Sequence, residues 1–140
     1  MSRILCVIDG MTDPHFQVER YGHLASMGSV RYVDTCGGFP PETLHCVLRL
    51  LGVTDLDAKT EAALRAAERC PFVLLHINGA DEAAHRHDSA EKETFLRRVD
   101  DRVLSRLLAS EHEIVVASDH GADPESGAHL GGPQPFFTSR

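Results

Sequence analysis

Residues 4–10 read Ile-Leu-Cys-Val-Ile-Asp-Gly, so a short apolar run ends directly in an aspartate. The arrangement recurs at residues 72–81, where an apolar run precedes Asp81, and at residues 114–120, where another precedes Asp119 and His120. Short runs rich in isoleucine and valine are typical of buried parallel strands, and ligands gather beyond the carboxyl ends of such strands. The three runs predict a sheet that brings these acids together at one edge.

Strand and helix patterns alternate along the chain. We expect strands near residues 3–8, 29–34, 72–77 and 113–118, a short edge strand at 134–138, and helices near 16–27, 42–51 and 57–69. Asp88 and Ser89 can cap a long helix, because an apolar stripe follows them at helical spacing. The stripe consists of Phe95, Leu96, Val99, Val103, Leu104, Leu107 and Leu108. This alternation predicts an α/β fold with a mostly parallel sheet flanked by helices on both faces.

The length of 140 residues suits one compact domain, so we expect residues 1–140 to form a single domain. The net charge is −7 with dispersed basic residues, which disfavours a nucleic-acid groove or an anionic membrane surface. No apolar run is long enough for a membrane span or a signal-peptide core, so a cytoplasmic location is expected. The four cysteines form no CxxC pair, which favours reduced thiols.

Each candidate ligand also has a structural explanation when it is taken alone. Asp9 precedes Gly10, a pair that commonly marks a turn. Asp81 and His85 are four residues apart and share one face of a helical turn, yet an aspartate near a helix start is often a cap. His129 lies in a glycine-rich loop that can either fold back over a site or stay solvated. The strand-end pair Asp119 and His120 is the most informative, because adjacent polar residues there are seldom present for solubility alone.

The joint pattern favours a metal site. Three carboxylates at one sheet edge would repel and raise one another's pKa values unless cations neutralised them. Mixed oxygen and imidazole ligands suit zinc, manganese or iron better than calcium, and they differ from an all-cysteine structural zinc site. The sequence therefore predicts a metal-centred active site.

Five motifs occur in order along the chain: Asp9-Gly10, residues 41–52, Gly79-Ala80-Asp81-Glu82-Ala83-Ala84-His85, Ser118-Asp119-His120-Gly121, and His129 before Gly131-Gly132-Pro133. Together they resemble the alkaline phosphatase superfamily. Within it, the likeness is nearest to cofactor-independent phosphoglycerate mutases of the archaeal type. The Asp-Glu-Ala-x-His and Asp-His-Gly elements carry most of the specificity.

The resemblance implies two divalent metal ions, manganese or zinc. It places one ion on Asp9, Asp119, His120 and Thr43, and the other on Asp81, His85 and His129. Thr43 falls where the family has its nucleophilic serine, with Gly52 as the anchor. After Pro40-Pro41, Thr43 is also placed to begin a helix, where its hydroxyl would lie near unpaired amides that suit a phosphoryl oxygen. Read locally, Thr43 is only an N-cap worth about 1 kcal/mol.

Three features separate the chain from the mutases. Leu44 replaces the family's acidic residue after the nucleophile, and Glu42 replaces the glycine before it. Only residues 53–71 join Gly52 to the apolar run at Phe72, where the mutases insert a second domain that clamps the phosphosugar acid. Without such a lid, water competes for a phosphoenzyme. The missing domain favours hydrolysis over mutase chemistry, whereas Leu44 and Glu42 disfavour simple binding of an anion.

The expected function is therefore metal-dependent phosphoryl transfer, as a phosphatase or phosphodiesterase that acts through a phosphothreonine intermediate on a small phosphorylated metabolite. The alternatives are phosphoglycerate mutase-like activity completed by a partner chain, a catalytically silent metal-binding domain, and an interaction module without metal. Arg86, next to His85, is a candidate phosphate contact, with Arg31 and Arg49 as others. A homo-oligomer is an open alternative to a monomer.

Overall fold

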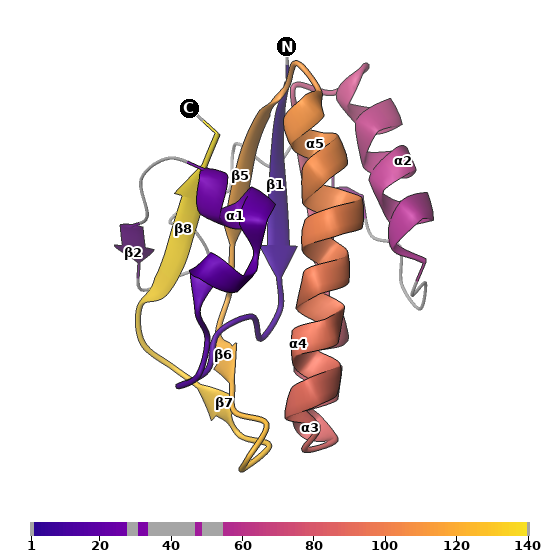
Figure 1. Cartoon of the computed structure of the whole chain (residues 1–140). Helices are drawn as coiled ribbons and strands as arrows, with labels where there is room; N and C mark the ends of the chain where they lie inside the picture. Colours follow the sequence, from indigo (N-terminus) through magenta and orange to yellow (C-terminus); the bar gives the residue numbers. More distant parts are fainter. Residues whose placement is uncertain (1, 28–30, 34–46, 49–54, 140) are drawn as a thin grey trace.

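A mixed sheet forms the centre of the computed structural model, which describes residues 2–27, 31–33, 47–48 and 55–139 (Figure 1). Within these residues the sheet has six strands in the order β2-β8-β5-β1-β4-β3. Their bounds are β1 (Arg3–Ile8), β2 (Arg31–Val33), β3 (Val47–Leu48), β4 (Phe72–Ile77), β5 (Glu113–Ala117) and β8 (Gln134–Thr138). Strand β1 pairs in parallel with both β4 and β5, and β3 pairs in parallel with β4. The predicted α/β fold with a mostly parallel sheet is confirmed.

One strand prediction and one helix prediction are wrong. Residues 134–138 were expected at an edge, but β8 lies between β5 and β2 and runs antiparallel to both. Residues 42–51 were expected to be helical, yet Val47 and Leu48 form β3, and the rest of that range lies outside the described residues. Two-residue pairing with a neighbouring strand leaves no periodic signal in a sequence, so local pattern did not reveal β3.

Aspartate side chains cap two of the helices, and the Asp88 cap was predicted from the sequence. Asp55 caps α2 (Leu56–Ala67) by accepting a hydrogen bond from the Ala58 amide. Asp88 caps α4 (Ser89–Arg98) by accepting one from the Glu91 amide. The long helix then continues through a π-helical segment, Val99–Leu104, into α5 (Ser105–Ala109). The short α3 (Gly79–His85) follows β4.

The predicted helix at residues 16–27 forms only in part. The chain makes a 3₁₀ turn at Val18–Arg20 and then the short α1 (Gly22–Ser26). The start of α1 is capped from the long helix, because the carboxylate of Asp100 accepts hydrogen bonds from the amides of His23 and Leu24 at 3.0 and 2.8 Å. A residue far along the sequence thus supplies the cap.

The described helices pack on one face of the sheet (Figure 1). Alternate residues of the central strands point into the core that they cover, such as Ile4, Cys6 and Ile8 of β1. Leu5 and Val7 face the other side, where they are also buried. Burial on both sides explains why the strands are continuous apolar runs. The described residues confirm helical cover for one face of the two that were expected.

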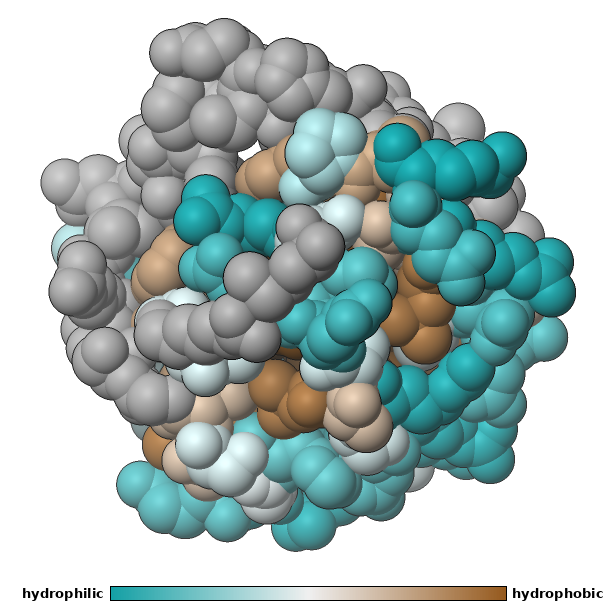
Figure 2. Space-filling model, turned by 90° about the horizontal axis from the view of Figure 1, so that it is seen from above, coloured by the Kyte–Doolittle hydropathy of each residue, from teal (hydrophilic) through white to brown (hydrophobic). Residues whose placement is uncertain are grey.

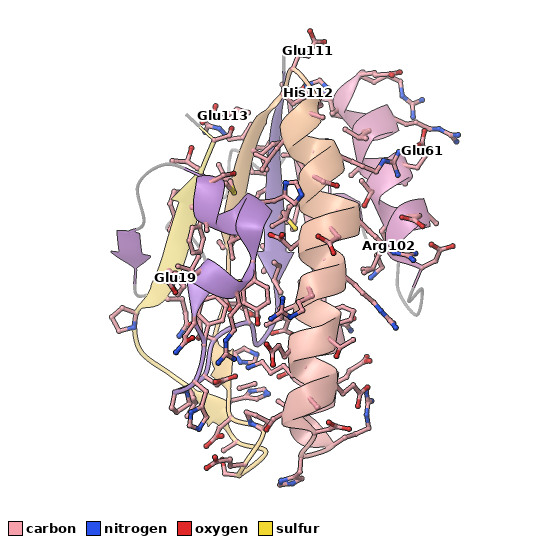
Figure 3. The ribbon with its side chains drawn as sticks, in the orientation of Figure 1. Glu19, Glu61, Arg102, Glu111, His112 and Glu113 are labelled. Atoms are coloured by element: carbon pink, nitrogen blue, oxygen red, sulfur yellow. The ribbon has the colours of Figure 1, made fainter. Side chains whose placement is uncertain are left out.

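Ion pairs join α2 to the long helix at the surface. Arg102 lies 3.2 Å from Asp57, and Arg106 pairs with Glu61. Glu61 on α2 and Arg102 on the neighbouring helix are both labelled in Figure 3. Exposed pairs of this kind contribute at most about 1 kcal/mol each.

At the end of the sheet where the two termini lie, the described surface is mostly hydrophilic at its rim, with small hydrophobic areas between (Figure 2). Over the described part of the chain, no helix has the length and apolar character needed to cross a bilayer. Cys6 is buried and Cys70 half-buried, and both are free thiols, as predicted. The remaining cysteines lie outside the described residues.

Candidate metal centre

The carboxyl ends of the three central strands bring six predicted ligands together. Asp9 follows β1, Asp81 and His85 lie on α3 directly after β4, and Asp119 and His120 follow β5. The sixth, His129, begins β7 (His129–Leu130), which pairs with β6 (Gly121–Ala122) in a small sheet at the same end of the molecule (Figure 1). We call Asp9, Asp81, His85, Asp119, His120 and His129 the ligand cluster.

Asp81 is the centre of one triad. Its Oδ1 lies 3.2 Å from Nε2 of His129, and its Oδ2 lies 3.2 Å from Nε2 of His85. The two Nε2 atoms are themselves 3.0 Å apart. All three side chains can therefore offer a ligand atom to one ion.

Asp9 and His120 form a second triad with the same Asp81. Nε2 of His120 lies 2.7 Å from Oδ1 of Asp9 and 3.9 Å from Oδ1 of Asp81. Oδ2 of Asp119 is also 3.9 Å from Nε2 of His120. The ring of His120 stacks on that of His129 with centroids 3.9 Å apart, so the two triads are adjacent.

Backbone carbonyls fix the protonation of two imidazoles. Nδ1 of His120 lies 2.7 Å from the Gly121 carbonyl oxygen, and Nδ1 of His85 lies 3.0 Å from that of Gly127. A carbonyl oxygen only accepts, so each Nδ1 carries the proton and donates it. In the neutral rings, Nε2 then presents a lone pair to the carboxylates. This orientation is the one that metal-binding histidines adopt, with the second nitrogen held by an outer partner.

Two buried carboxylate oxygens of the cluster lack a hydrogen-bond donor in the described part of the chain. Oδ1 of Asp9 and Oδ1 of Asp81 are buried and accept no hydrogen bond from the described residues. Burial raises the pKa of Asp9 to about 7, and a hydrogen bond and the negative charge of Asp119 act in the same direction. Burial lowers the pKa of His120, but the Gly121 carbonyl and the carboxylates of Asp119, Asp9 and Asp81 outweigh it and raise the value overall. The donor set therefore fits divalent cations.

Solvent exposure differs among the side chains of the ligand cluster. The side chains of Asp9 and Asp81 are 16 % exposed, whereas those of His85 and His129 are about half exposed. His120 is 20 % and Asp119 36 % exposed, so Asp9, Asp81 and His120 lie at the base of the cluster, and Asp119, His85 and His129 lie at its solvent side.

Gly10 allows Asp9 to come this close to α3. Its φ is +68°, and a Cβ there would lie 2.9 Å from the Asp81 Cα. The Asp-Gly turn that local sequence suggested is therefore real, and it also serves the cluster.

His76 was not predicted to belong to the site. Its Nε2 lies 3.9 Å from Oδ2 of Asp9, and His76, Asp9 and Asp119 form a further group whose ligand atoms are mutually within 4.8 Å. The sequence offered one sign of this role, which is a single ionisable residue inside the apolar run of β4. In the structure its side chain is half-exposed. Pairing of β4 with β1 sets His76 opposite Val7, two residues before Asp9.

Other candidates are placed differently. Thr43, with Glu42 and Leu44, lies outside the described residues. Arg86 ends α3, pairs with Glu91, and lines a cleft of about 470 Å³ to which none of the ligand cluster contributes. His23, Asp100 and Asp101 also lie close together, but Asp100 is already engaged in capping α1.

Comparison with known proteins agrees with this geometry. The family model described as the Metalloenzyme superfamily matches residues 10–139. A 2,3-bisphosphoglycerate-independent phosphoglycerate mutase 2 of Methanothermobacter thermautotrophicus is 37 % identical over 86 residues, which cover 59 % of this chain and 21 % of that protein. The corresponding mutase of Methanococcus aeolicus is 29 % identical over 116 residues, 81 % of this chain and 26 % of its own length.

A solved structure, that of the PH0037 protein from Pyrococcus horikoshii, matches with a TM-score of 0.56 and 27 % identity. The match covers 61 % of this chain and 27 % of that one. The chain thus spans about a fifth to a quarter of the length of the curated relatives named above.

Proposed function

Because this chain belongs to the Metalloenzyme superfamily, we propose that it is an enzyme of metal-dependent phosphoryl transfer whose active site is the ligand cluster. The observation that carries the proposal is the sharing of Asp81 by two triads, each completed by imidazole nitrogens that lie near the carboxylates. Two cations held side by side suit displacement at phosphorus, where attacking and leaving oxygens both need stabilisation.

The proposed division of ligands keeps Asp81 shared between the two triads. Asp81, His85 and His129 hold one ion, while Asp9, Asp119 and His120 hold the other with Asp81 at its edge, together with the Thr43 hydroxyl. When bound, the ions lower the pKa of a coordinated hydroxyl and neutralise charge on the phosphoryl group. The metals proposed are manganese or zinc, which suit this mixture of oxygen and nitrogen donors.

For the reaction we propose hydrolysis of a phosphate ester. The Thr43 hydroxyl gives its proton to solvent water as its oxygen bonds to phosphorus, and the bond from phosphorus to the ester oxygen breaks, so that this oxygen leaves with the electron pair and takes a proton from water. A water molecule then attacks phosphorus, the bond from phosphorus to the Thr43 oxygen breaks, that oxygen regains a proton, and inorganic phosphate is released. The imidazoles and carboxylates of the ligand cluster hold their positions through these steps. The substrate class is a small phosphorylated metabolite, and the proposed location is the cytoplasm.

Mutase-like activity is the second candidate, favoured by the names of the relatives. In this chain the segment that leads to β4 contains α2 alone among its described residues, so a partner chain would have to supply the contacts that retain the intermediate. A homo-oligomer could provide them.

The decisive experiment combines metal content with turnover. Purified protein, stripped with a chelator and reloaded with Mn²⁺ or Zn²⁺, should bind about two ions per chain and hydrolyse an aryl phosphate. Thr43→Ala should abolish turnover and retain both ions, and a phosphate adduct on Thr43 should be detectable by mass spectrometry in the unmodified chain. Undiminished turnover in Thr43→Ala would show that the nucleophile is another group. Metal binding without turnover of any phosphate ester would favour a catalytically silent metal-binding domain.

A further inference from the structure

A lysine is buried immediately behind the ligand cluster. The side chain of Lys92, on α4, is 2 % exposed. Its ammonium group donates to three oxygens: the Asp13 carboxylate at 2.7 Å, the Ala122 carbonyl at 2.8 Å and the Thr12 carbonyl at 3.2 Å. An ammonium has three N–H donors, so this group is fully satisfied by the protein.

The three acceptors belong to the two loops that carry the central ligands. Thr12 and Asp13 lie in the segment that follows Asp9, and Ala122 lies two residues after His120. The loops also touch directly, because the Ala122 amide donates to the Thr12 carbonyl at 2.8 Å. Lys92 therefore ties the loop that follows β1 to the loop that follows β5, from a third element.

Close packing leaves these loops little freedom to shift on their own. A Cβ at Gly121 would lie 2.9 Å from both the carbonyl oxygen and the hydroxyl of Thr12. The Thr12 hydroxyl in turn bonds to the amide oxygen of Gln134, on β8. Among the described residues around these loops, Lys92 of α4 is the cation that reaches all three acceptor oxygens.

Electrostatics distinguish Lys92 from ordinary core packing. Burial lowers its pKa, and the hydrogen bond and charge of Asp13 counteract that effect. Burying an ion pair is seldom more stabilising than apolar packing of equal volume, so stability alone is a weak explanation for a charge here. The specific consequence of the charge is the fixed spacing of the loops.

We propose that Lys92 is a positioning residue of the metal centre, which holds the loops of Asp9 and His120 at the separation that lets both ligate one ion. The inference rests on the proposed function, since it presumes that the ligand cluster binds metal. Among the described residues, Lys92 forms no hydrogen bond or ion pair with a member of the cluster, so it acts through Thr12, Asp13 and Ala122.

The test is Lys92→Met, which keeps the length of the side chain and removes the charge. Titration of the metal-free protein with Co²⁺ should give affinity about 10- to 100-fold weaker than for the unmodified chain, the range seen when outer partners of metal ligands are removed. The visible spectrum of bound Co²⁺, which reports coordination geometry, should also change.

Asp100→Asn is the matched control. Asp100 is another buried charge on the same long helix, it also binds backbone groups of a distant segment, and that segment holds no member of the ligand cluster. This variant should lose stability with an unaltered Co²⁺ spectrum and affinity. The double variant Asp13→Leu with Lys92→Met removes both charges, and should regain stability without regaining affinity.

Unchanged Co²⁺ affinity and spectrum in Lys92→Met would overturn the inference, as would affinity that simply follows stability across all three variants. If the unmodified chain itself binds no Co²⁺, the proposed function fails before the question of Lys92 arises.

Discussion

Nε2 of His120 lies 2.7 Å from Oδ1 of Asp9, while Nδ1 of the same ring donates to the Gly121 carbonyl. When the ring is neutral and Asp9 is ionised, two electron-rich atoms thus face each other with no proton between them. Such an arrangement is unfavourable unless Asp9 or the imidazole gains a proton or a cation lies nearby. The folded chain therefore favours the binding of a cation between Asp9 and His120.

Metal binding should stabilise the fold. A ligand at 100 times its dissociation constant raises the free energy of unfolding by about 2.7 kcal/mol. We expect the thermal midpoint to rise when Mn²⁺ or Zn²⁺ is added to chelated protein, and to fall when a chelator is added back. Addition of a monovalent salt to the chelated protein, in buffer without Mg²⁺, is the control and should not raise the midpoint. A midpoint indifferent to all divalent ions would contradict the two-triad interpretation.

The metal-free protein should lose stability as the pH rises toward neutrality. The pKa of Asp9 is about 7 in the folded chain, against 3.8 for an ordinary aspartate, so between these values the folded state holds a proton that the unfolded state has lost. The contribution is fully present below the lower value and is lost as the pH passes the upper one.

Metal affinity should follow the opposite trend, because a cation must displace the proton of Asp9. Urea unfolding of chelated protein and Mn²⁺ titrations, both between pH 5 and 8, would measure the two trends. The Asp9→Asn variant should flatten the stability trend. If its trend matches that of the unmodified chain, another group is responsible.

Asp81→Asn should weaken metal binding and stabilise the metal-free protein. Asp81 contributes to both triads, so its loss should reduce the metal content from two ions per chain to less than one. The metal-free variant should be more stable than the metal-free parent, by an amount on the order of 1 kcal/mol, since it lacks the buried carboxylate charge whose Oδ1 accepts no hydrogen bond from the described residues. Asp123→Asn, in the loop after β6, is the control and should keep both ions. Retention of two ions by Asp81→Asn would rule out the shared carboxylate.

His76→Asn should weaken the ion on the Asp9 side more than the ion on the Asp81 side. His76 groups with Asp9 and Asp119 but not with His85 or His129. Stepwise titration with Zn²⁺ should show one of two affinities reduced. His15→Asn, an exposed histidine that pairs with Glu125, should leave both unchanged. Equal effects of the two substitutions would remove His76 from the site.

Gly10→Ala should destabilise the protein by about 1–3 kcal/mol, because alanine is strained at a φ of +68° and its Cβ would meet the Asp81 backbone. Displacement of Asp9 should also weaken metal binding. Gly22→Ala is the control, since nothing lies within 4 Å of a Cβ there and its φ is not positive. Chemical denaturation measures the first effect, and a Gly10→Ala variant as stable as Gly22→Ala would be evidence against the close contact.

Much of the fold could be predicted from the sequence, because the strands and helix caps depend on local patterns of residues. The runs that form β1, β4 and β5 are continuous and apolar since both faces of these strands are buried. Asp55 and Asp88 cap their helices through residues three positions on. By contrast, the splitting of the helix expected at residues 16–27 depends on Asp100, which no local pattern connects to α1.

The sequence by itself determined which side chains can bind metal and that Asp9, Asp81 and Asp119 come after three apolar strands. Only the tertiary structure decided that Asp81 is shared between triads, that His76 joins Asp9, and that Lys92 ties two ligand-bearing loops. These relationships arise from strand order and close packing between segments far apart in the chain, and such contacts leave no periodicity for a sequence to display.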